Sequence, residues 1–446
     1  MIKVITYGTY DLLHQGHINL LRRAKALGDY LIVGVTSDSF DKGRGKLNVR
    51  NNVLERVEAV KATGYADEVI IEDYMGQKID DIQRYGVDVF AIGSDWVGKF
   101  DYLNEYCKVV YLPRTEGVSS TQLRAESQSI VKIGIIGSGR IARRFVPESS
   151  VVDGAQIETV YNPNRNEAEA FSKEFKVALS TEFEAFLESV DAVYIASPHL
   201  SHYTYARRAL EADKHVLCEV PMVLSKQEAC ELYGLAEKKD IVLLEANKTA
   251  FCPAFGHVVT LVKSGLIGDV VDVRASLSKM VPAPTRELDA SQGGGAMNEH
   301  ASLTLLPVMK ILGKDFSDIQ FHSKMDHGVD VYTKAVVNYP HATSSVTLGV
   351  GVKTEGDLVI SGTKGYVYVP APWWLTDYFE IRYEDSARNK KYFYSYDGEG
   401  LRYEIQEFVS MIVNGRRSSY KMKKEESIGI ADIIERYNKG YNLTIL

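Results

Sequence analysis

Cysteine is scarce in this chain, and the few that are present form no recognisable metal or disulfide pattern. The sequence has four, Cys107, Cys218, Cys230 and Cys252, and no two of them make a C-x-x-C pair. Structural disulfides belong mainly to oxidising compartments, where small domains carry many of them. We therefore expect reduced thiols in a cytoplasmic protein.

The sequence also lacks an excess of basic residues and any long apolar segment. Its formal net charge is −7, whereas proteins that bind nucleic acid present a basic face. No stretch approaches the roughly 18 apolar residues that a membrane-spanning helix needs. The first apolar run, in MIKVITYG, is too short for a signal peptide and continues directly as a strand pattern. We expect neither a nucleic-acid nor a membrane partner.

What the chain does contain is enough sequence for two or three domains, because it has 446 residues and one hydrophobic core stops growing at about 250–300. Short apolar runs alternate with amphipathic helical patterns from the first residue, as in a parallel sheet with crossover helices. The alternation restarts at Val131, and from about residue 268 strands follow one another with few helices. We predict an α/β protein with three domains, at 1–126, 131–250 and 251–446.

Two histidines, His14 and His17, stand in YGTYDLLHQGHINLL, where a strand pattern gives way to a helix. The spacing alone suits ordinary loop histidines equally well, and a zinc site would need further ligands that are not evident nearby. At the carboxyl end of a strand and the start of a helix, free N–H groups and the helix dipole favour a phosphate. Gly8 and Gly16 let the backbone approach a ligand closely. We interpret the histidines as phosphate contacts.

A second segment with these features is YLPRTEGVSSTQLR, residues 111–124. Arg114 follows a strand, and hydroxyl side chains open the next helix as caps and hydrogen-bond donors. Together with Lys46 and the two histidines, these helix ends would suit a polyphosphate.

On these motifs, residues 1–126 resemble the glycerol-3-phosphate cytidylyltransferases of the HxGH nucleotidyltransferase superfamily. The resemblance covers nearly the whole segment, including GSDWVGKFDYL and VVYLPRTEGVSSTQLR. It implies a Rossmann-like sheet and the transfer of CMP from CTP to a polyol phosphate, with release of pyrophosphate. Phosphoethanolamine as acceptor, or adenylyl transfer, are alternatives, because the phosphate motif does not read the base. Mg²⁺ is expected to accompany CTP with few protein ligands.

The resemblance also assigns roles to residues of this segment. Because the acceptor oxygen attacks the α-phosphorus in line, positioning and charge stabilisation carry the catalysis. The implied catalytic residues are His14, His17, Lys46 and Arg114, and the implied nucleotide-binding residues are Thr9, Asp11, His14, His17, Asp95, Arg114, Thr115 and Ser119. Gly64 stands where the family often carries an arginine. If that arginine binds the acceptor, the acceptor here differs from glycerol-3-phosphate.

The second alternating series opens with GIIGSGRIA, in which Gly137, Gly139 and Ala142 follow a strand and begin a helix. This placement indicates a dinucleotide site. The acidic residue expected about 20 residues further on is absent, and Asn162 stands there with Arg165 nearby. An arginine without the carboxylate favours NADP over NAD, although a solvated loop charge is an equally good interpretation of Arg165.

Residues 131–446 resemble the glucose–fructose oxidoreductase and inositol dehydrogenase family, through YIASPHLSHYTYARRALEADKHVLCEVPM and GGGAMNEHASLTLLPVMKILG. The resemblance implies a dinucleotide-binding Rossmann domain, then an α+β domain whose open-faced mixed sheet carries the substrate, and a homo-oligomer, either a dimer or a tetramer. The implied cofactor-binding residues are Gly137, Gly139, Arg140, Ile141, Ala142, Asn162, Arg165, Ser197, Pro198, His199 and Glu219.

The catalytic set of that family is incomplete here. Val220 replaces the lysine of the family's EKP motif, and Leu303 stands at the position of a histidine or tyrosine, while Glu299 replaces an aspartate. A proton donor contributes typically 10²–10⁴-fold, and valine cannot replace one. Two residues are candidates to do so. We rank Lys248 in EANKT ahead of His300 for this role. The alternatives are an exposed loop cation for Lys248 and an ordinary helix-end residue for His300.

These observations leave two hypotheses for the C-terminal half. In the first, it reduces a keto-phosphate to the polyol phosphate that the N-terminal half activates for a cell-surface polymer such as teichoic acid or capsule. In the second, it is a non-catalytic, cofactor-bound scaffold. Lys248, Glu299 and His300 favour the first, whereas Val220 and Leu303 favour the second.

Overall fold

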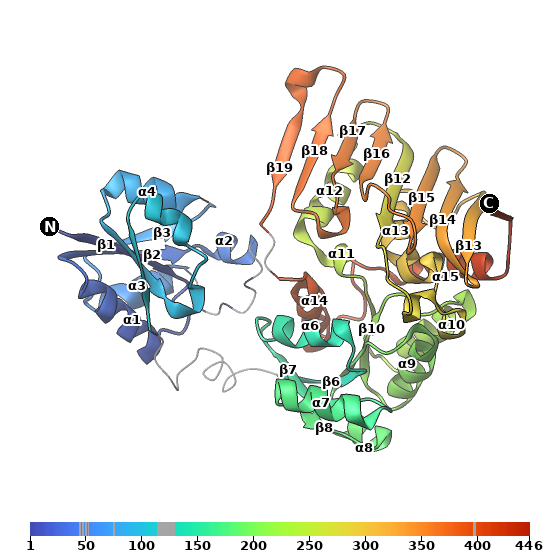
Figure 1. The fold of residues 1–446 in the computed structure, drawn as a ribbon, viewed down its shortest axis with the longest axis horizontal. Coiled ribbons are helices and arrows are strands. Elements are labelled where there is room, and N and C mark those ends of the chain that lie inside the picture. The colour runs from blue at the N-terminus through green and yellow to red at the C-terminus, as the bar shows by residue number, and fades with distance from the viewer. Residues whose placement is uncertain are drawn as a thin grey trace. The chain divides into compact units, whose positions relative to one another are not determined.

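The computed structural model describes residues 1–43, 46, 49, 51, 53–74, 76–113, 130–395 and 398–446. Arg114, Thr115 and Ser119 of the predicted nucleotide site lie outside these residues. The chain divides into two compact units, the first made of Met1–Ile130 and the second of Val131–Ser149 and Ala155–Leu446 (Figure 1). None of the described helices combines the length and apolar character needed to cross a lipid bilayer.

The first unit is a five-stranded parallel sheet in the order β3-β2-β1-β4-β5. Its strands are β1 (Lys3–Gly8), β2 (Tyr30–Thr36), β3 (Glu68–Glu72), β4 (Val89–Gly93) and β5 (Lys108–Leu112), and its helices are α1 (Gln15–Lys25), α2 (Asp38–Gly43), α3 (Val53–Ala62), α4 (Gln77–Tyr85), η1 (Ser94–Trp96) and η2 (Asp101–Glu105). Successive residues of β1 enter different cores. Val4 packs with Leu21 of α1 and Val60 of α3, whereas Ile5 packs with Ile82 of α4. Helices therefore cover both faces, as the alternating pattern predicts.

The second unit begins with a six-stranded parallel sheet in the order β11-β10-β9-β6-β7-β8. The strands are β6 (Val131–Ile136), β7 (Ala155–Tyr161), β8 (Ala178–Leu179), β9 (Ala192–Ile195), β10 (His215–Glu219) and β11 (Leu243–Ala246), with helices α6 (Arg140–Ser149), α7 (Arg165–Phe175), α8 (Phe183–Glu188), η3 (His199–Ser201), α9 (His202–Glu211) and α10 (Lys226–Lys238). The residues of β6, β9 and β11 are almost all buried, which is typical of a parallel sheet between two helix layers.

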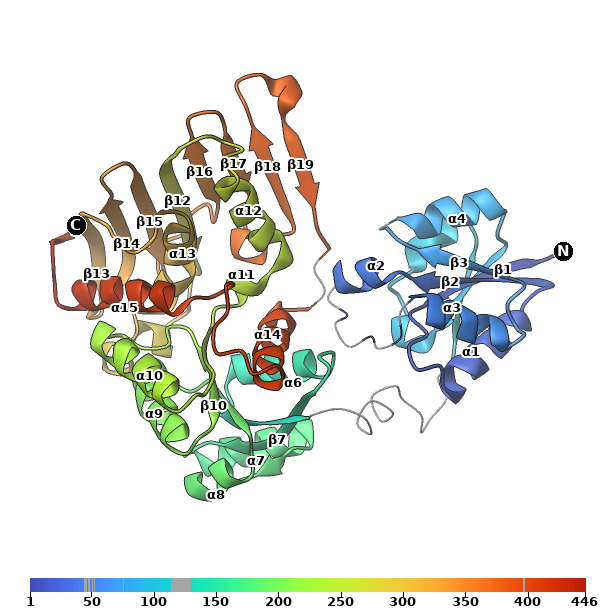
Figure 2. The ribbon, with the colours of Figure 1, turned by 180° about the vertical axis from the view of Figure 1, so that it is seen from behind.

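A nine-stranded mixed sheet follows, in the order β19-β18-β17-β16-β12-β15-β14-β13-β20. Its strands are β12 (Val270–Ser278), β13 (Asp318–Asp326), β14 (Val329–Asn338), β15 (Thr343–Gly349), β16 (Leu358–Gly362), β17 (Tyr366–Val369), β18 (Tyr378–Arg382), β19 (Lys390–Phe393) and β20 (Leu443–Ile445). The helices of this part are α11 (Lys248–Phe251), α12 (Pro253–Lys263), α13 (Ala296–Leu312), α14 (Leu401–Val413) and α15 (Lys424–Asn438), with short turns η4 (Arg286–Leu288), η5 (Ala290–Gln292), η6 (Trp373–Leu375) and η7 (Ser386–Arg388). In Figure 2, α12 and α15 lie in front of the strands of this sheet. The predicted fold class is confirmed.

Helix α14 belongs to the C-terminal part of the chain but packs on the parallel sheet of the second unit, against α6 and beside β6 and β7. Its position is fixed by an ion pair in which Arg402 Nη2 lies 2.7 Å from Glu148 Oε1 of α6, with both side chains nearly buried. The C-terminal chain therefore contributes directly to the surroundings of the dinucleotide fingerprint.

Candidate functional site

In the first unit, the loop after β1 places both predicted histidines at the start of α1. His14 is the N-cap residue, and its Nδ1 accepts a hydrogen bond from the Gly16 N–H at 3.1 Å. The His14 and His17 rings are stacked, with their centroids 3.9 Å apart. Two imidazoles therefore lie side by side at a helix N-terminus, where the unpaired N–H groups and the dipole attract an anion.

Lys46, which is far from Thr9 in sequence, contacts Thr9 in the loop that carries the histidines. Lys46 Nζ donates to Thr9 Oγ1 at 2.7 Å, and Thr9 Oγ1 donates to Asp41 Oδ1 at 3.2 Å. The amine of Lys46 is thus held beside the loop that carries the histidines. A cation in this position would neutralise a triphosphate.

Arg56 is a residue of this site that the sequence analysis missed. It is 1% exposed, its Nη1 donates to the Thr9 carbonyl at 2.7 Å, and its Nη2 donates to Asp38 Oδ1 at 2.6 Å. The guanidinium therefore fixes the backbone of the histidine loop. Its spacing in the sequence could have indicated that it is buried, because Arg56 shares a helical face with Val53, Val57 and Val60 of α3.

The two predicted carboxylates lie at neighbouring strand ends. Asp11 is 2% exposed, and its Oδ1 accepts the Asn51 N–H at 3.0 Å. Asp95 is exposed in η1, directly after β4. Because β1 and β4 adjoin where the strand order reverses, their carboxyl ends form the crevice in which such sheets bind ligands. These carboxylates supply at most two protein ligands, which suits a Mg²⁺ ion held chiefly by triphosphate oxygens.

In the second unit, a cavity of about 1060 Å³ lies at the carboxyl ends of the parallel strands, large enough for a dinucleotide. The predicted cofactor residues in its wall are Gly137, Gly139, Arg140, Ile141, Asn162, Ser197, Pro198, His199 and Glu219. Two predicted residues are not part of the wall. Ala142 is fully buried in the core, and the exposed Arg165 pairs with Glu169 on its own helix at 2.8 Å.

The two glycines of the fingerprint face different surroundings. Gly137 has a φ of 98°, and a Cβ there would stand 2.6 Å from the carbonyl oxygen of Ala196. At Gly139, nothing lies within 4 Å of an added Cβ. The first glycine is therefore required by the backbone turn, while the second leaves open space at the start of α6 for a phosphate. These residues fit a dinucleotide cofactor.

We expect Gly137→Ala to destabilise the second unit by about 1–3 kcal/mol, because alanine at that φ is strained and its Cβ meets a backbone oxygen. Gly139→Ala is the matched control and should change stability by no more than about 0.5 kcal/mol. Calorimetric unfolding of the full chain measures both. Equal stability of the Gly137→Ala variant and the wild type would show that this turn relaxes freely.

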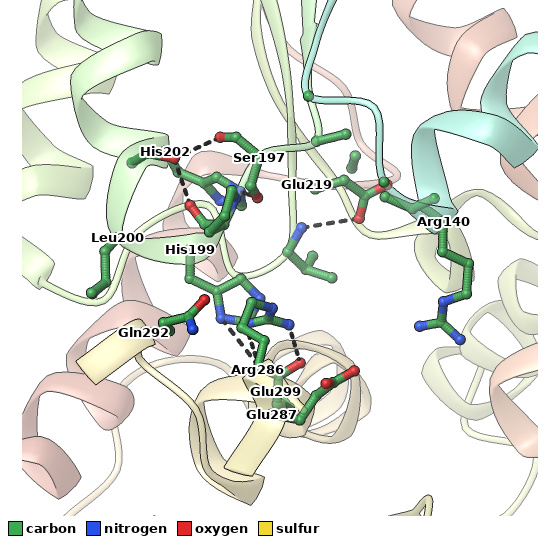
Figure 3. A pocket seen from close by; sticks show the side chains of 18 of the residues that line it. Arg140, Ser197, His199, Leu200, His202, Glu219, Arg286, Glu287, Gln292 and Glu299 are labelled. Carbon is green, nitrogen blue, oxygen red and sulfur yellow. Dashed lines mark hydrogen bonds and ion pairs between the residues drawn. The ribbon is translucent and has the colours of Figure 1, made fainter. Parts of the chain in front are cut away.

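Another part of the cavity wall carries a polar cluster made of Arg286, Glu299 and His199 (Figure 3). Arg286 contacts both carboxylate oxygens of Glu299, at 2.8 and 2.9 Å, and His199 Nδ1 lies 3.5 Å from Glu299 Oε1, without hydrogen-bond geometry. Burial, together with the charges of His202 and Arg286, lowers the pKa of His199 well below its usual range. A neutral imidazole therefore stands beside an arginine–carboxylate pair.

The two candidate proton donors, Lys248 and His300, line the cavity. Val220 and Leu303, which stand where the family carries catalytic side chains, line the same cavity. Lys248 begins α11, and its Nζ donates to the Glu399 carbonyl at 3.2 Å. His300 is on α13, and its Nε2 is buried without a hydrogen-bond partner among the described residues. Burial lowers the pKa of His300 to about 4. The cavity that lacks the family's lysine thus contains another amine and a neutral imidazole.

Glu167 is a second residue that the sequence analysis missed. It lies on α7, lines the cavity, and its Oε2 accepts a hydrogen bond from Asn162 Nδ2 at 3.2 Å. The signal was helix capping: Asn164 is the N-cap of α7, and Glu167 occupies the third helical position, from which a carboxylate reaches back toward the cap.

Comparisons with known proteins identify families for both units. Residues 5–126 match the family model described as cytidylyltransferase-like. Residues 131–246 match the oxidoreductase family with an NAD-binding Rossmann fold, and residues 255–368 match the GFO/IDH/MocA C-terminal domain. A glycerol-3-phosphate cytidylyltransferase from Bacillus spizizenii is 50% identical over 135 residues, which cover 29% of this chain and 100% of that protein. The corresponding protein of Bacillus subtilis is 51% identical over 126 residues, which cover 28% of this chain and 97% of it.

The second unit has more distant relatives. A trans-1,2-dihydrobenzene-1,2-diol dehydrogenase from Danio rerio is 25% identical over 315 residues, covering 68% of this chain and 94% of that protein. The crystal structure of a 3-ketoreductase from Actinomadura kijaniata has the same fold, with a TM-score of 0.64 at 22% identity, covering 71% of this chain and 99% of that one. The chain therefore belongs to the cytidylyltransferase-like family in its first unit and to the GFO/IDH/MocA oxidoreductase family in its second. As such, it is a nucleotidyltransferase fused to a domain with an NAD(P)-binding Rossmann fold.

Proposed function

We propose that the first unit transfers CMP from CTP to a polyol phosphate, glycerol-3-phosphate or a similar acceptor, and releases pyrophosphate. The 50% identity to a glycerol-3-phosphate cytidylyltransferase over the whole of that protein carries the proposal. The stacked pair His14 and His17 and the amine of Lys46 support it, because they would stabilise negative charge as pyrophosphate leaves. Arg114, Thr115 and Ser119 complete the proposed nucleotide site, and Mg²⁺ accompanies CTP. The product would supply a cell-surface polymer such as teichoic acid or capsule from the cytoplasm.

Pyrophosphate release, measured with each nucleoside triphosphate against a panel of acceptors, tests this proposal. The panel includes glycerol-3-phosphate, other polyol phosphates and phosphoethanolamine. It has to be broad because Gly64, where relatives often have arginine, leaves open space where a side chain would stand. We expect activity with CTP and one polyol phosphate. Strong activity with ATP and none with CTP would overturn the proposal.

For the second unit, we propose NAD(P)-dependent reduction of a keto-phosphate to the polyol phosphate that the first unit consumes. A nicotinamide held there would supply the hydride for the carbonyl carbon, and Lys248 would protonate the carbonyl oxygen. We assign the pyrophosphate to the turn at Gly137 and Gly139, and the nicotinamide side to Ser197, Pro198, His199 and Glu219, all of which line one cavity. Fusion of the two activities would raise the local concentration of the shared intermediate.

A cofactor-binding scaffold is the competing function, and it is favoured by Val220 and Leu303, which line the cavity where relatives carry catalytic groups. Fluorescence titration with NADH and NADPH, followed by absorbance assays with dihydroxyacetone phosphate and ribulose-5-phosphate, separates the two. Tight cofactor binding without turnover of any keto-phosphate would establish the scaffold. On either account, we propose domains at 1–126, 131–250 and 251–446 and a homo-oligomer, either a dimer or a tetramer.

Two side chains of α7 would have opposite effects on the affinity for NADP relative to NAD. Arg165 would attract the 2′-phosphate of NADP, whereas Glu167, in the cavity wall, would repel it and accept the 2′-hydroxyl of NAD. We expect Glu167→Gln to raise the affinity for NADPH relative to NADH on the order of tenfold, because it removes a like charge from the cavity wall. Competition titration measures the ratio, with Glu174→Gln, exposed near the opposite end of α7, as control. An unchanged ratio would mean that Glu167 does not face the ribose.

A further inference from the structure

Four ionisable side chains from four elements lie in the wall of the cofactor cavity or buried behind it. They are Tyr194 of β9, Glu219 of β10, Lys248 of α11 and Glu404 of α14. The Tyr194 hydroxyl donates to Glu219 Oε1, and both Glu219 and Lys248 line the cavity. Glu404 is near enough to interact electrostatically with Glu219, Lys248 and Tyr194.

Glu404 is the unusual member of this group. It is 0% exposed, and neither of its carboxylate oxygens has a hydrogen-bond partner among the described residues. A buried carboxylate without hydrogen bonds is strongly disfavoured, so such a group retains its proton instead. Burial, with the charge of Glu219, raises the pKa of Glu404 well above its usual range.

Glu219 and Glu404 compete for the same neighbouring cation. Glu148 of α6 also faces Glu404, but it is bound by Arg402. Glu245 of β11 is buried and adds a further acidic neighbour to Glu219. Among the described residues that face the two carboxyls, Lys248 is thus the cation left to balance them.

Because one ammonium cannot balance two buried carboxylates, at least one proton stays on the Glu219–Glu404 pair. Burial raises the pKa of Glu219 to about 7, against the opposing hydrogen bond from Tyr194. Since Glu219 also lines the cavity, the pair has one member in contact with the cavity and one sealed behind it. The buried Glu404 therefore keeps its proton, while Glu219 can exchange one with the cavity that it lines.

We propose that Glu219 and Glu404 form a proton-holding pair behind Lys248, with Glu404 as a positioning residue that keeps a carboxylic acid beside the substitute lysine. This inference rests on the proposed reduction. In that reaction, the nicotinamide cofactor would supply the hydride for the carbonyl carbon, and the carbonyl oxygen would take its proton from the Lys248 ammonium. Lys248 then recovers a proton from the Glu219–Glu404 pair, which is reprotonated by water in the cavity.

Infrared difference spectroscopy of the full chain tests the pair directly, because a protonated carboxyl absorbs apart from a carboxylate. At pH 7 we expect Glu404→Gln to lose one protonated-carboxyl band that the wild type shows. Glu407→Gln is the matched control on the same helix. Although burial acts to raise the pKa of Glu407, hydrogen bonds from Arg416 and Ser419 lower it, so this variant should lose no such band. Retention of the band in Glu404→Gln would overturn the inference.

Two further variants test the coupling and do not depend on Glu404→Gln folding correctly. Lys248→Met should shift the titration of the carboxyl band to higher pH, because removal of the cation disfavours the carboxylate. Glu219→Gln should leave a single carboxyl that stays protonated at pH 7. An unshifted titration in Lys248→Met would also overturn the inference. None of these measurements uses a keto-phosphate, so absence of turnover in the wild type would discard the proposed reductase and leave the spectroscopic result to be judged by itself.

Discussion

Replacement of His17 by alanine is expected to lower the turnover of CMP transfer by about 10²–10³-fold, the cost of removing one group that stabilises developing charge. His17 stacks on His14 at the N-terminus of α1, so its imidazole adds to a site already polarised for an anion. The loss should appear in the rate at saturating CTP rather than only in the KM, because the interaction strengthens as pyrophosphate departs. Steady-state pyrophosphate release measures both.

Lys61→Ala is the control for this variant. Lys61 is exposed near the end of α3 of the same unit and pairs only with Glu58 on its own helix among the described residues, so its removal should leave turnover unchanged. A near-wild-type rate for His17→Ala would show that His17 is an ordinary loop histidine without a catalytic role.

The second large effect is expected for Lys248→Ala, which should lower the rate of NAD(P)H oxidation with the keto-phosphate substrate by about 10²–10⁴-fold. The cavity wall holds Val220 where relatives have lysine, and Lys248 is an amine in the same wall to which we assign protonation of the carbonyl oxygen. Cofactor affinity should persist, because the glycine turn does not depend on this side chain. Absorbance assays and fluorescence titration of the same preparation separate catalysis from binding.

Lys263→Ala provides the comparison, since Lys263 is exposed at the end of α12 and should not affect turnover. Unchanged turnover of Lys248→Ala would transfer the role of acid to His300, whose Nε2 faces no hydrogen-bond partner among the described residues.

The fold could be predicted from the sequence because it depends on local periodicity. The alternation of β1 side chains between two cores and the restart of the pattern at Val131 both follow from side-chain direction in strands and helices. The placement of Lys248 near Val220 could also be predicted from the sequence. Parallel neighbours such as β10 and β11 bring their carboxyl ends to one edge.

The rest of the candidate sites could not be predicted because it depends on tertiary packing. Arg165 and Glu167 stand two residues apart on α7, yet only Glu167 reaches the cavity. This difference is set by the rotation of a helix, which spacing from the glycine motif does not determine. Glu404 looks like one more charge on an amphipathic helix, and nothing local reveals that α14 packs against α6. Arg56 is an intermediate case, because the sequence pattern predicts its helical face but not its hydrogen-bond partners.

The packing of α14 on α6 has a consequence for how this protein is made. A ribosome releases the whole of β6 to β11 before the chain that contains Arg402 exists, so Glu148 first emerges without its partner. Until residues 401–413 arrive, the nascent dinucleotide layer exposes the apolar surface that α14 covers, which is the kind of intermediate that aggregates or recruits chaperones. A recombinant fragment that stops at residue 250 would remain in that unfinished state, so the cofactor-binding layer has to be produced together with the C-terminal chain.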